Sequence, residues 1–457
     1  MAVDQETQET LNQPYAGYYR ASHPRRPDME LVETGPDTQG GEYLRRFWHP
    51  VCLTADLGEL PLAIRIMSED LVAYRDRSGA IGILHRHCSH RGTSLEYGIV
   101  SEHGLRCCYH GWLFDADGSI LETPGEPTES RLKESFRHGA YPAVEFNGLV
   151  FAYMGPPERK PPFPNFDTFH VPDTELVPYS ILQPCNWLHV HENIMDASHV
   201  LFLHSAMGSQ QLGPNMAIMP RFEYRETDDG HGCLYVTTRR VGEYVWVRCI
   251  HTLLPNIFQA ASLYGEIDFE RFFQQTSMTR WTVPVDNTNA TIFGLRHFND
   301  KTDAPKFSDR SKVGKERIDF APGQTGGRPY EETQRDPGDW DVLVSLGPIP
   351  DHGGEHRGTT EEGVMILRRQ LRRGIRQDVE PTCHLPQNNW DARATFTFDA
   401  IMRIPPRESG DNDLLSEVGS RATDIVLQAP ESPGPERDAA ITERIKALKE
   451  SFMSDAQ

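Results

Sequence analysis

Two short motifs, each pairing a cysteine with a histidine, constrain the fold of this chain more than any other feature. Cys88 and His90 are separated by one residue, and Cys107 and His110 by two residues. Sixteen residues lie between His90 and Cys107. Two thiolates and two imidazoles form a complete set of four metal ligands. The chain must therefore fold so that two tight loops meet around one metal centre.

The mixed pairs favour a Rieske [2Fe–2S] cluster, in which two histidines replace two cysteines on one of the irons. The alternative is a structural zinc site, but zinc motifs usually group the two cysteines and the two histidines separately. Gly92 and Gly111 follow the two histidines and allow each loop to turn tightly. Cys108 stands beside Cys107, and only the spacing to His110 selects Cys107 as the ligand. The motif predicts a protein that accepts and passes single electrons.

Composition narrows the class of protein. With 457 residues the chain is long enough for two or three domains, and its formal net charge of −20 argues against nucleic-acid binding. The negative charge of the chain would allow an electron-donor protein to dock through a basic patch, or it simply maintains solubility. No stretch approaches the ~18 apolar residues of a transmembrane helix, and the N-terminus is polar and acidic. We expect a cytoplasmic protein without a disulfide framework.

The order of strand, turn and helix signals predicts an α+β chain in four parts. We expect an N-terminal arm and helix (1–47), with the helical signal at 42–48, an antiparallel β Rieske domain with the cluster loops at its tips (48–157), and a helix-plus-antiparallel-sheet catalytic domain (158–405). A C-terminal extension (406–457) would follow, with few apolar anchors up to residue 436 and a terminal helix at 442–452. A proline-rich linker marks the second boundary. In the third part we expect a helical stretch at 186–204, a helix at 363–375, a long loop at 298–338, plausibly a lid, and strands at 235–238, 244–252, 281–285 and 290–295.

A second metal motif lies in the predicted helical stretch 186–204, where Asp196, His199 and His204 form D-x₂-H-x₄-H. Two histidines and one carboxylate make the ligand set of non-heme Fe(II) oxygenases, which leaves positions open for O₂ and substrate. Residues five apart are about 140° apart on a regular α-helix, so the two histidines converge only if the helix bulges or ends between them. The alternative is an ordinary pair of core or surface histidines, because this stretch is rich in histidine.

With both motifs in this order, the chain from residue 42 to about 403 resembles the oxygenase component of the Rieske non-heme iron ring-hydroxylating oxygenases. The resemblance implies that His199 and His204 bind a mononuclear Fe²⁺. It implies that Asp196 bridges His199 and His110 of a neighbouring subunit for electron transfer, in a head-to-tail ring that is usually a trimer. The cluster would be held by Cys88, His90, Cys107 and His110.

The third iron ligand implied by the resemblance is a downstream carboxylate on a helix. The candidates are Asp336, Asp339, Asp341 and Asp351. Residues 339–349 resemble a segment of the phthalate dioxygenase branch, where the acid lies eight residues before the glycine of Gly-Pro-Ile, and Asp339 has that position. Helical spacing also places Asp339 on one face with Leu343 and Leu346. Asp341 is the alternative.

The resemblance implies a terminal oxygenase that takes electrons from NADH through a separate reductase or ferredoxin and activates O₂. The alternative from another class, a Rieske electron carrier, would leave residues 160–405 without a role. In the segment 244–248, Arg248 and Trp246 share one strand face and are candidates to contact a substrate carboxylate and ring, although an exposed arginine on a sheet edge is equally consistent. Arg239 and Arg240 are weaker candidates.

For the substrate, the resemblance to the aryl-ether O-demethylase branch implies a lignin-derived aromatic acid, such as dehydrodivanillate, that is O-demethylated or hydroxylated. A phthalate-type ring cis-dihydroxylation is the second possibility. The long loop at 298–338 suggests that the substrate is bulky.

Overall fold

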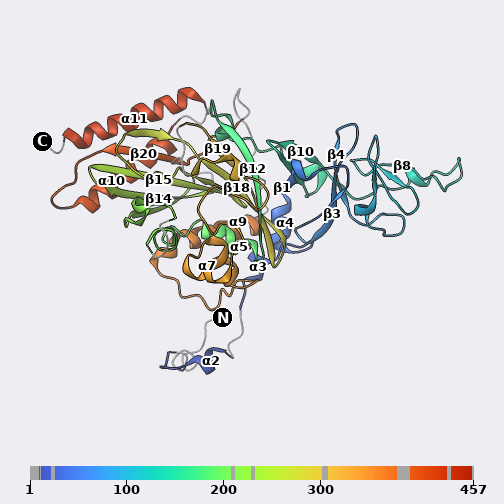
Figure 1. Ribbon diagram of the computed structural model, residues 1–457, viewed down its shortest axis with the longest axis horizontal. Coiled ribbons are helices and arrows are strands. Elements are labelled where there is room, and N and C mark those ends of the chain that lie inside the picture. The colour runs from blue at the N-terminus through green and yellow to red at the C-terminus, as the bar shows by residue number, and fades with distance from the viewer. Residues whose placement is uncertain are drawn as a thin grey trace.

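Two domains lie side by side along the long axis of the molecule (Figure 1). The computed structural model describes residues 10, 12–21, 26–206, 211–227, 232–300, 307–377, 392–429 and 434–454. The first domain is built from antiparallel β-sheets, and the second combines one large antiparallel sheet with helices. The α+β class and the order of the two domains are therefore confirmed.

The first domain contains three small antiparallel sheets, with strand orders β1-β11-β10, β2-β3-β4-β9 and β5-β6-β7-β8. Apolar side chains such as Val72, Leu84 and Phe114 pack together with Cys88 and Cys107 in one hydrophobic core of this domain. Both cysteines of the paired motifs are thus part of a hydrophobic core. The strands are β1 (Trp48–Leu53), β2 (Leu62–Ile66), β3 (Glu69–Arg75), β4 (Ile81–His85), β5 (Ile99–Val100), β6 (Leu105–Arg106), β7 (Leu113–Phe114), β8 (Ile120–Glu122), β9 (Ala140–Tyr141), β10 (Ala143–Phe146) and β11 (Leu149–Tyr153).

The second domain is organised by a nine-stranded sheet in the order β12-β19-β18-β16-β15-β14-β13, with β20 pairing with both β15 and β17. All its pairings are antiparallel. The four strands expected from the sequence lie within β14, β15, β18 and β19. The strands are β12 (Glu175–Gln183), β13 (Arg221–Glu226), β14 (Gly232–Val241), β15 (Tyr244–Leu253), β16 (Ile257–Ala260), β17 (Arg271–Gln274), β18 (Met278–Asp286), β19 (Asn289–Phe298) and β20 (Phe398–Arg403).

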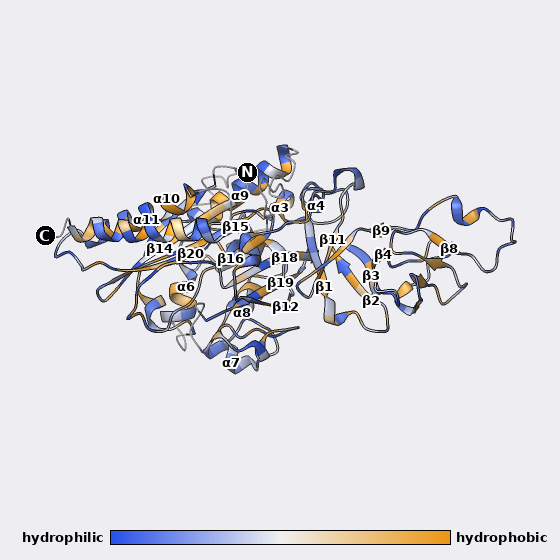
Figure 2. Cartoon of the chain, turned by 90° about the horizontal axis from the view of Figure 1, so that it is seen from above, coloured by the Kyte–Doolittle hydropathy of each residue, from blue (hydrophilic) through white to orange (hydrophobic). Residues whose placement is uncertain are grey.

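Helices α10 (Asp411–Leu427) and α11 (Pro435–Ser454) cover one face of this sheet. Leu414, Val418 and Ile441 are buried there against Val245 and Val247 of β15. Helices α6 (His199–Leu201) and α8 (Asp339–Ser345) lie on the opposite side (Figure 2). The helix expected at 442–452 lies within α11. The segment expected to have few apolar anchors instead contains α10, which completes the core because it repeats apolar residues at helical spacing.

The N-terminal segment joins the two domains rather than forming a free arm. Helices α3 (Met29–Val32) and α4 (Gln39–Arg45) pack against α9 (Glu362–Gln377) of the second domain, and a short α2 (Gly17–Ala21) precedes them. The buried Arg45 reaches the first domain, where Nη2 lies 2.8 Å from Oε1 of Glu69. The helices expected at 42–48 and 363–375 correspond to α4 and α9.

The described part of the stretch at 298–338 is anchored to the domain. It contains α7 (Tyr330–Arg335), and Phe307 and Val313 are buried. Asp319 forms a buried ion pair with Arg296 of β19 at 2.9 Å. The expectation of a simple long loop is therefore wrong for residues 307–338. Among the described helices, none combines the length and the apolar character needed to span a membrane.

Candidate functional site

The two Cys/His loops have the same backbone design. The N–H of Cys88 donates to the carbonyl of Thr93 at 2.9 Å, and the N–H of Cys107 donates to that of Trp112 at 2.8 Å. In each loop a glycine four residues after the cysteine donates back to the cysteine carbonyl. Both glycines, Gly92 and Gly111, have positive φ angles of 80° and 75°, which other residues adopt only with strain. The sequence expectation of tight glycine turns is met.

These turns send the cysteines inward and the histidines outward. Cys88 and Cys107 are each only 3% exposed, whereas the rings of His90 and His110 are half-buried, with centroids 4.5 Å apart. Nδ1 of His90 is buried and has no hydrogen-bond partner within the described part of the chain. Cys108 is exposed, which leaves Cys107 as the thiol that faces Cys88. The donor set therefore fits a cluster with an inner thiolate-bound iron and an outer imidazole-bound iron.

A single zinc ion fits these loops less well. Tetrahedral zinc with its usual bond lengths holds its ligand atoms roughly 3.3–3.8 Å apart. Among the described residues, the groups whose ligand atoms all lie within 4.8 Å of one another are His199 with His204 and Asp339, and Glu192 with His352 and Glu355. The four loop ligands are too widely spread for one ion.

The second of these groups is already neutralised by an arginine. The guanidinium of Arg368 contacts both Glu192 and Glu355, with Nη1 2.6 Å from Oε2 of Glu355 and Nη2 2.6 Å from Oε2 of Glu192. A cation in the same place would compete with a bound positive charge. The contact between Arg368 and Glu192 links α9 to α5 (Trp187–Asn193), and we do not assign a metal to this cluster.

The helical stretch that carries D-x₂-H-x₄-H is interrupted in the way the spacing requires. Helix α5 ends at Asn193, α6 runs from His199 to Leu201, and a π-helical turn, η6, runs from Phe202 to Ala206. A π-helical turn closes i→i+5 hydrogen bonds and so brings residues five apart onto one side. The ring centroids of His199 and His204 are 5.4 Å apart. The expected bulge between the two histidines is present.

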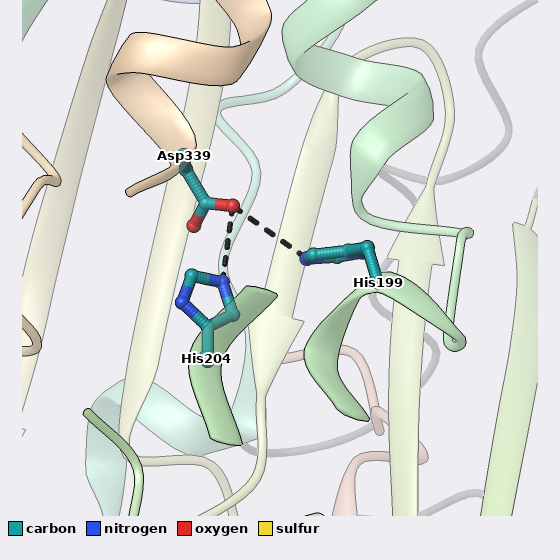
Figure 3. Close-up of side chains that lie close together, drawn as sticks. All are labelled: His199, His204 and Asp339. Carbon is teal, nitrogen blue, oxygen red and sulfur yellow. Dashed lines mark hydrogen bonds and ion pairs between the residues drawn. The ribbon is translucent and has the colours of Figure 1, made fainter. Parts of the chain in front are cut away.

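Both histidines face the carboxylate of Asp339, the first residue of α8 (Figure 3). Oδ1 of Asp339 lies 3.1 Å from Nε2 of His204 and 3.6 Å from Nε2 of His199. The carboxylate is fixed by amide donors that the sequence did not reveal: Gln324 donates to Oδ2 at 2.6 Å, and Asn193 donates to Oδ1 at 3.1 Å. No sequence signal marked these two amides, because both are ordinary polar residues far from Asp339 in the chain.

Hydrogen bonds on the far side of each ring determine which nitrogen carries the proton. Nδ1 of His199 donates to the carbonyl of Asp196, and Nδ1 of His204 donates to Oε1 of Gln211 at 2.8 Å. Gln211 is oriented in turn by Asp336, which accepts from its amide at 2.9 Å. Both Nε2 lone pairs therefore point at a carboxylate oxygen. A lone pair that faces a carboxylate oxygen is repelled by it unless a proton or a metal cation lies between the two atoms.

The electrostatics of the three groups agree with this geometry. Although burial opposes ionisation, the two imidazoles hold the pKa of Asp339 far below its ordinary value, so the carboxylate is ionised. Burial lowers the pKa of His199 and so favours its neutral form. Burial also opposes protonation of His204, but the adjacent Asp339 carboxylate raises the net pKa of that histidine. A divalent cation would balance the carboxylate and displace the proton from His204.

The competing carboxylates are used elsewhere. Oδ2 of Asp341 contacts Arg328 and accepts the N–H of Gly338 at 2.9 Å. Oδ1 of Asp336 accepts from Gln211, and Oδ1 of Asp351 accepts the N–H of Arg26. Of the four sequence candidates, the structure brings only Asp339 to the two histidines.

A small cavity of about 60 Å³ adjoins the two histidines and Asp339. Its other walls include Phe258, Met278 and Arg280, and Arg248 also lines it. Arg280 was missed by sequence reasoning, since nothing distinguishes it from other strand arginines. Trp246 is fully buried, donates to Asp399 at 2.9 Å, and is not among the described residues that line the cavity. Arg239 is likewise buried, and Arg240 pairs with Asp411.

Known proteins match this chain over nearly its whole length. The Rieske [2Fe-2S] domain family matches residues 47–137. The chain is 42% identical to the tert-butanol monooxygenase / tert-amyl alcohol desaturase oxygenase subunit of Aquincola tertiaricarbonis, covering 93% of this chain and 94% of that protein. It is 37% identical to the phenoxybenzoate dioxygenase subunit alpha of Ectopseudomonas oleovorans, over 79% and 88% of the two chains.

A third relative, the 5,5'-dehydrodivanillate O-demethylase oxygenase subunit of Sphingobium sp., is 31% identical over 76% of this chain and 79% of that protein. Among solved structures, dicamba monooxygenase bound to dicamba has a TM-score of 0.55 at 19% identity, covering 73% of this chain and 98% of that one, which shows the fold alone. The identities and coverage of the sequence relatives show the family. The chain belongs to the Rieske non-heme iron oxygenases, as an oxygenase subunit whose cofactors are a Rieske [2Fe–2S] cluster and a mononuclear iron.

Proposed function

We propose that Cys88, His90, Cys107 and His110 hold the [2Fe–2S] cluster and that His199, His204 and Asp339 hold the mononuclear iron. The observation that carries the second assignment is the meeting of two imidazole lone pairs and one ionised carboxylate beside a cavity. Three protein ligands leave coordination positions open toward that cavity.

The function that this arrangement supports is that of a terminal oxygenase in a multicomponent system. The bound cofactors supply one-electron transfer and O₂ activation, with electrons that we propose come from NADH through a separate reductase or ferredoxin. The protein's own residues orient the ligands. Gln211 and the Asp196 carbonyl fix the tautomers of the two histidines, while Gln324 and Asn193 hold the carboxylate. Amide and carbonyl partners of this kind typically change metal affinity or activity by about 10–100-fold.

We propose that Asp196 connects this iron site to a cluster on a neighbouring subunit. Oδ1 of Asp196 accepts from the N–H and hydroxyl of Ser198, while Oδ2 lies 4.0 Å from Nδ1 of His199. The carboxylate lines a surface cavity of about 440 Å³, together with Leu346 and Arg357 among other residues. In one chain the cluster loops and the iron site belong to different domains (Figure 1). A head-to-tail ring, most simply a trimer, would bring the outward-facing His110 of one subunit to Asp196 of the next.

The size of the active-site cavity favours a compact substrate. Its volume of about 60 Å³ is well below the ~150 Å³ of a cavity that admits benzene, so even one aromatic ring requires side chains to move. The names of the relatives point to a tertiary alcohol in one case and to an aromatic acid or ether in the others. We propose hydroxylation or O-demethylation of a single-ring aromatic acid, and the cavity argues against a substrate as bulky as dehydrodivanillate.

The test is reconstitution. The purified protein, supplied with a Rieske oxygenase reductase and NADH, is offered single-ring methoxylated and unsubstituted aromatic acids and tert-butanol, while O₂ uptake and products are followed. We expect substrate-dependent O₂ uptake with formation of a demethylated or hydroxylated product. A protein that carries both metals yet oxidises no member of the panel would contradict the proposed substrate class, and cluster reduction without any O₂ consumption would contradict an oxygenase role.

A further inference from the structure

Two arginines line the active-site cavity, and their surroundings differ. Arg248 is buried, and its guanidinium is engaged by the main chain: Nη2 donates to the carbonyl of Ala261 at 2.9 Å and Nε to that of Ser262 at 3.3 Å. Its donors hold the turn that follows β16, so Arg248, the candidate from the sequence, has a structural task.

Arg280 has no such task. It extends from the cavity face of β18, next to Met278 on the same face, and its guanidinium carbon lies 4.7 Å from the centroid of the Phe258 ring. Its Nε is buried and, within the described part of the chain, has no hydrogen-bond partner; no carboxylate there forms an ion pair with it. The one carboxylate that shares the cavity, Asp339, is contacted by His204 and Gln324.

The unbalanced charge of Arg280 affects the residues behind it. Burial, with a smaller contribution from the charge of Arg280, lowers the pKa of His191 to about 3. Arg280 likewise opposes the burial that raises the pKa of Tyr179 to about 12. Both effects have the sign expected of the positive charge of Arg280. Arg280 is half-buried, its buried Nε has no partner among the described residues, and a ligand that brings a negative charge would supply one.

We infer that Arg280 is the residue that selects an anionic substrate, by receiving a carboxylate in the cavity while the rest of the molecule faces the iron ligands. This inference rests on the proposed oxygenase function and narrows its substrate class. The planar guanidinium offers parallel donors that match the two oxygens of a carboxylate, and the Phe258 ring beneath it keeps the plane in place. A neutral tertiary alcohol supplies no charge to match and leaves the guanidinium uncompensated.

The test measures binding rather than turnover. The metal-loaded full-length protein, kept anaerobic and without reductase, is titrated calorimetrically with 3-methoxybenzoate, with the neutral isostere 3-methoxybenzamide, and with tert-butanol. We expect the acid to bind at least tenfold more tightly than the amide. Arg280→Gln should lose roughly 10–100-fold in affinity for the acid, the loss expected for a charge-assisted contact, and about threefold or less for the amide. Arg280→Lys should restore part of the preference for the acid.

Arg421→Gln is the matched control, because Arg421 also lies over a phenylalanine ring, Phe452, at 4.9 Å, but on the far face of the sheet. It should bind both aromatic probes like the unmodified protein. A preference for the acid that survives in Arg280→Gln would overturn the inference, as would equal binding of acid and amide by the unmodified protein, or binding of tert-butanol alone. Loss of O₂-dependent turnover with intact acid binding would instead count against the proposed function and leave the role of Arg280 standing.

Discussion

The two metal sites of this chain are assembled in different ways. The four residues proposed to hold the cluster lie within one 23-residue stretch, and each pair is fixed by a turn whose hydrogen bonds close within five residues. The residues proposed to hold the iron come from η6, α6 and α8, and Asp339 is 135 residues from His204. The cluster loops therefore depend on local backbone geometry, whereas the iron site depends on the packing of the whole second domain. A fault in the second domain should thus empty one site and spare the other.

The sharpest contrast within the cluster loops is between two adjacent cysteines. Cys107→Ser should abolish the red-brown absorbance and the rhombic EPR signal of the reduced cluster, because it removes a ligand from the core of the first domain. Cys108→Ser should leave both signals unchanged, since Cys108 is exposed. Equal loss of the cluster in both variants would show that the two thiols share the role.

The corresponding pair at the iron site is Asp339 and Asp341. Asp339→Asn should remove the mononuclear iron and reduce turnover to background, yet leave the cluster spectrum intact. Asp341→Asn should keep iron and turnover and cost about 1 kcal/mol of stability, because it weakens the cap at Gly338. Metal analysis, EPR and thermal unfolding check the two variants. Iron loss in Asp341→Asn alone would mean that the ligand assignment is wrong.

A smaller effect is expected where the two sites meet. Asp196→Asn should keep both metals and the oligomer but slow turnover about 100-fold, because an amide accepts the hydrogen bond proposed from His110 of the next subunit less well than a carboxylate does, and because it removes the negative charge 4.0 Å from Nδ1 of His199. Single-turnover oxidation of the reduced cluster measures the step directly, and light scattering reports the oligomer. A native mass equal to that of one chain, or a normal oxidation rate in the variant, would refute the bridge.

The tautomer of His204 offers a subtler probe. Gln211→Leu removes the acceptor at Nδ1, so we expect iron affinity to fall about tenfold while the folded state and the cluster spectrum persist. Gln211→Glu keeps an acceptor at Nδ1 but faces the Asp336 carboxylate without a donor, so we expect an affinity between those of the unmodified protein and Gln211→Leu. Competition with a chelator measures both. Unchanged affinity in Gln211→Leu would show that the hydrogen bond does not orient the ring.

The smallest expected effect lies at the joint between the N-terminal segment and the first domain. Although burial opposes ionisation, hydrogen bonds from His85, Tyr141 and Arg45 lower the pKa of Glu69 from 4.5 to about 2. A depressed carboxyl pKa stabilises the fold above pH 4.5, and this stabilisation is lost as the pH falls from about 4.5 toward 2. Glu69→Gln should reduce this pH dependence by an amount on the order of 1–3 kcal/mol. Unfolding at pH 7 and pH 3, with Glu129→Gln as an exposed control, tests it.

The same contrast explains what could be predicted from the sequence. The paired Cys/His motifs and the D-x₂-H-x₄-H pattern are local, so their spacing alone indicated turns and an interrupted helix, and both are present. Asp339 was reached through resemblance and helical spacing, not through geometry. Gln211, Gln324 and Arg280 carried no signal, because their importance arises only when distant elements pack together. Residues 406–429 were misjudged from their polar composition, although Leu414, Val418 and Ala422 recur at helical spacing and form the buried face of α10.

The π-helical turn at Phe202–Ala206 has a consequence for how this iron site tolerates change in the chain. The turn gives a five-residue spacing the direction that a four-residue spacing has in an ordinary α-helix. Deleting one residue from 200–203 should therefore let the stretch relax into an α-helix, with both imidazoles still on one side. A five-residue spacing in a π-helical turn and a four-residue spacing in an α-helix would then serve the iron site equally well. What the metal requires is that the two imidazole rings point in the same direction.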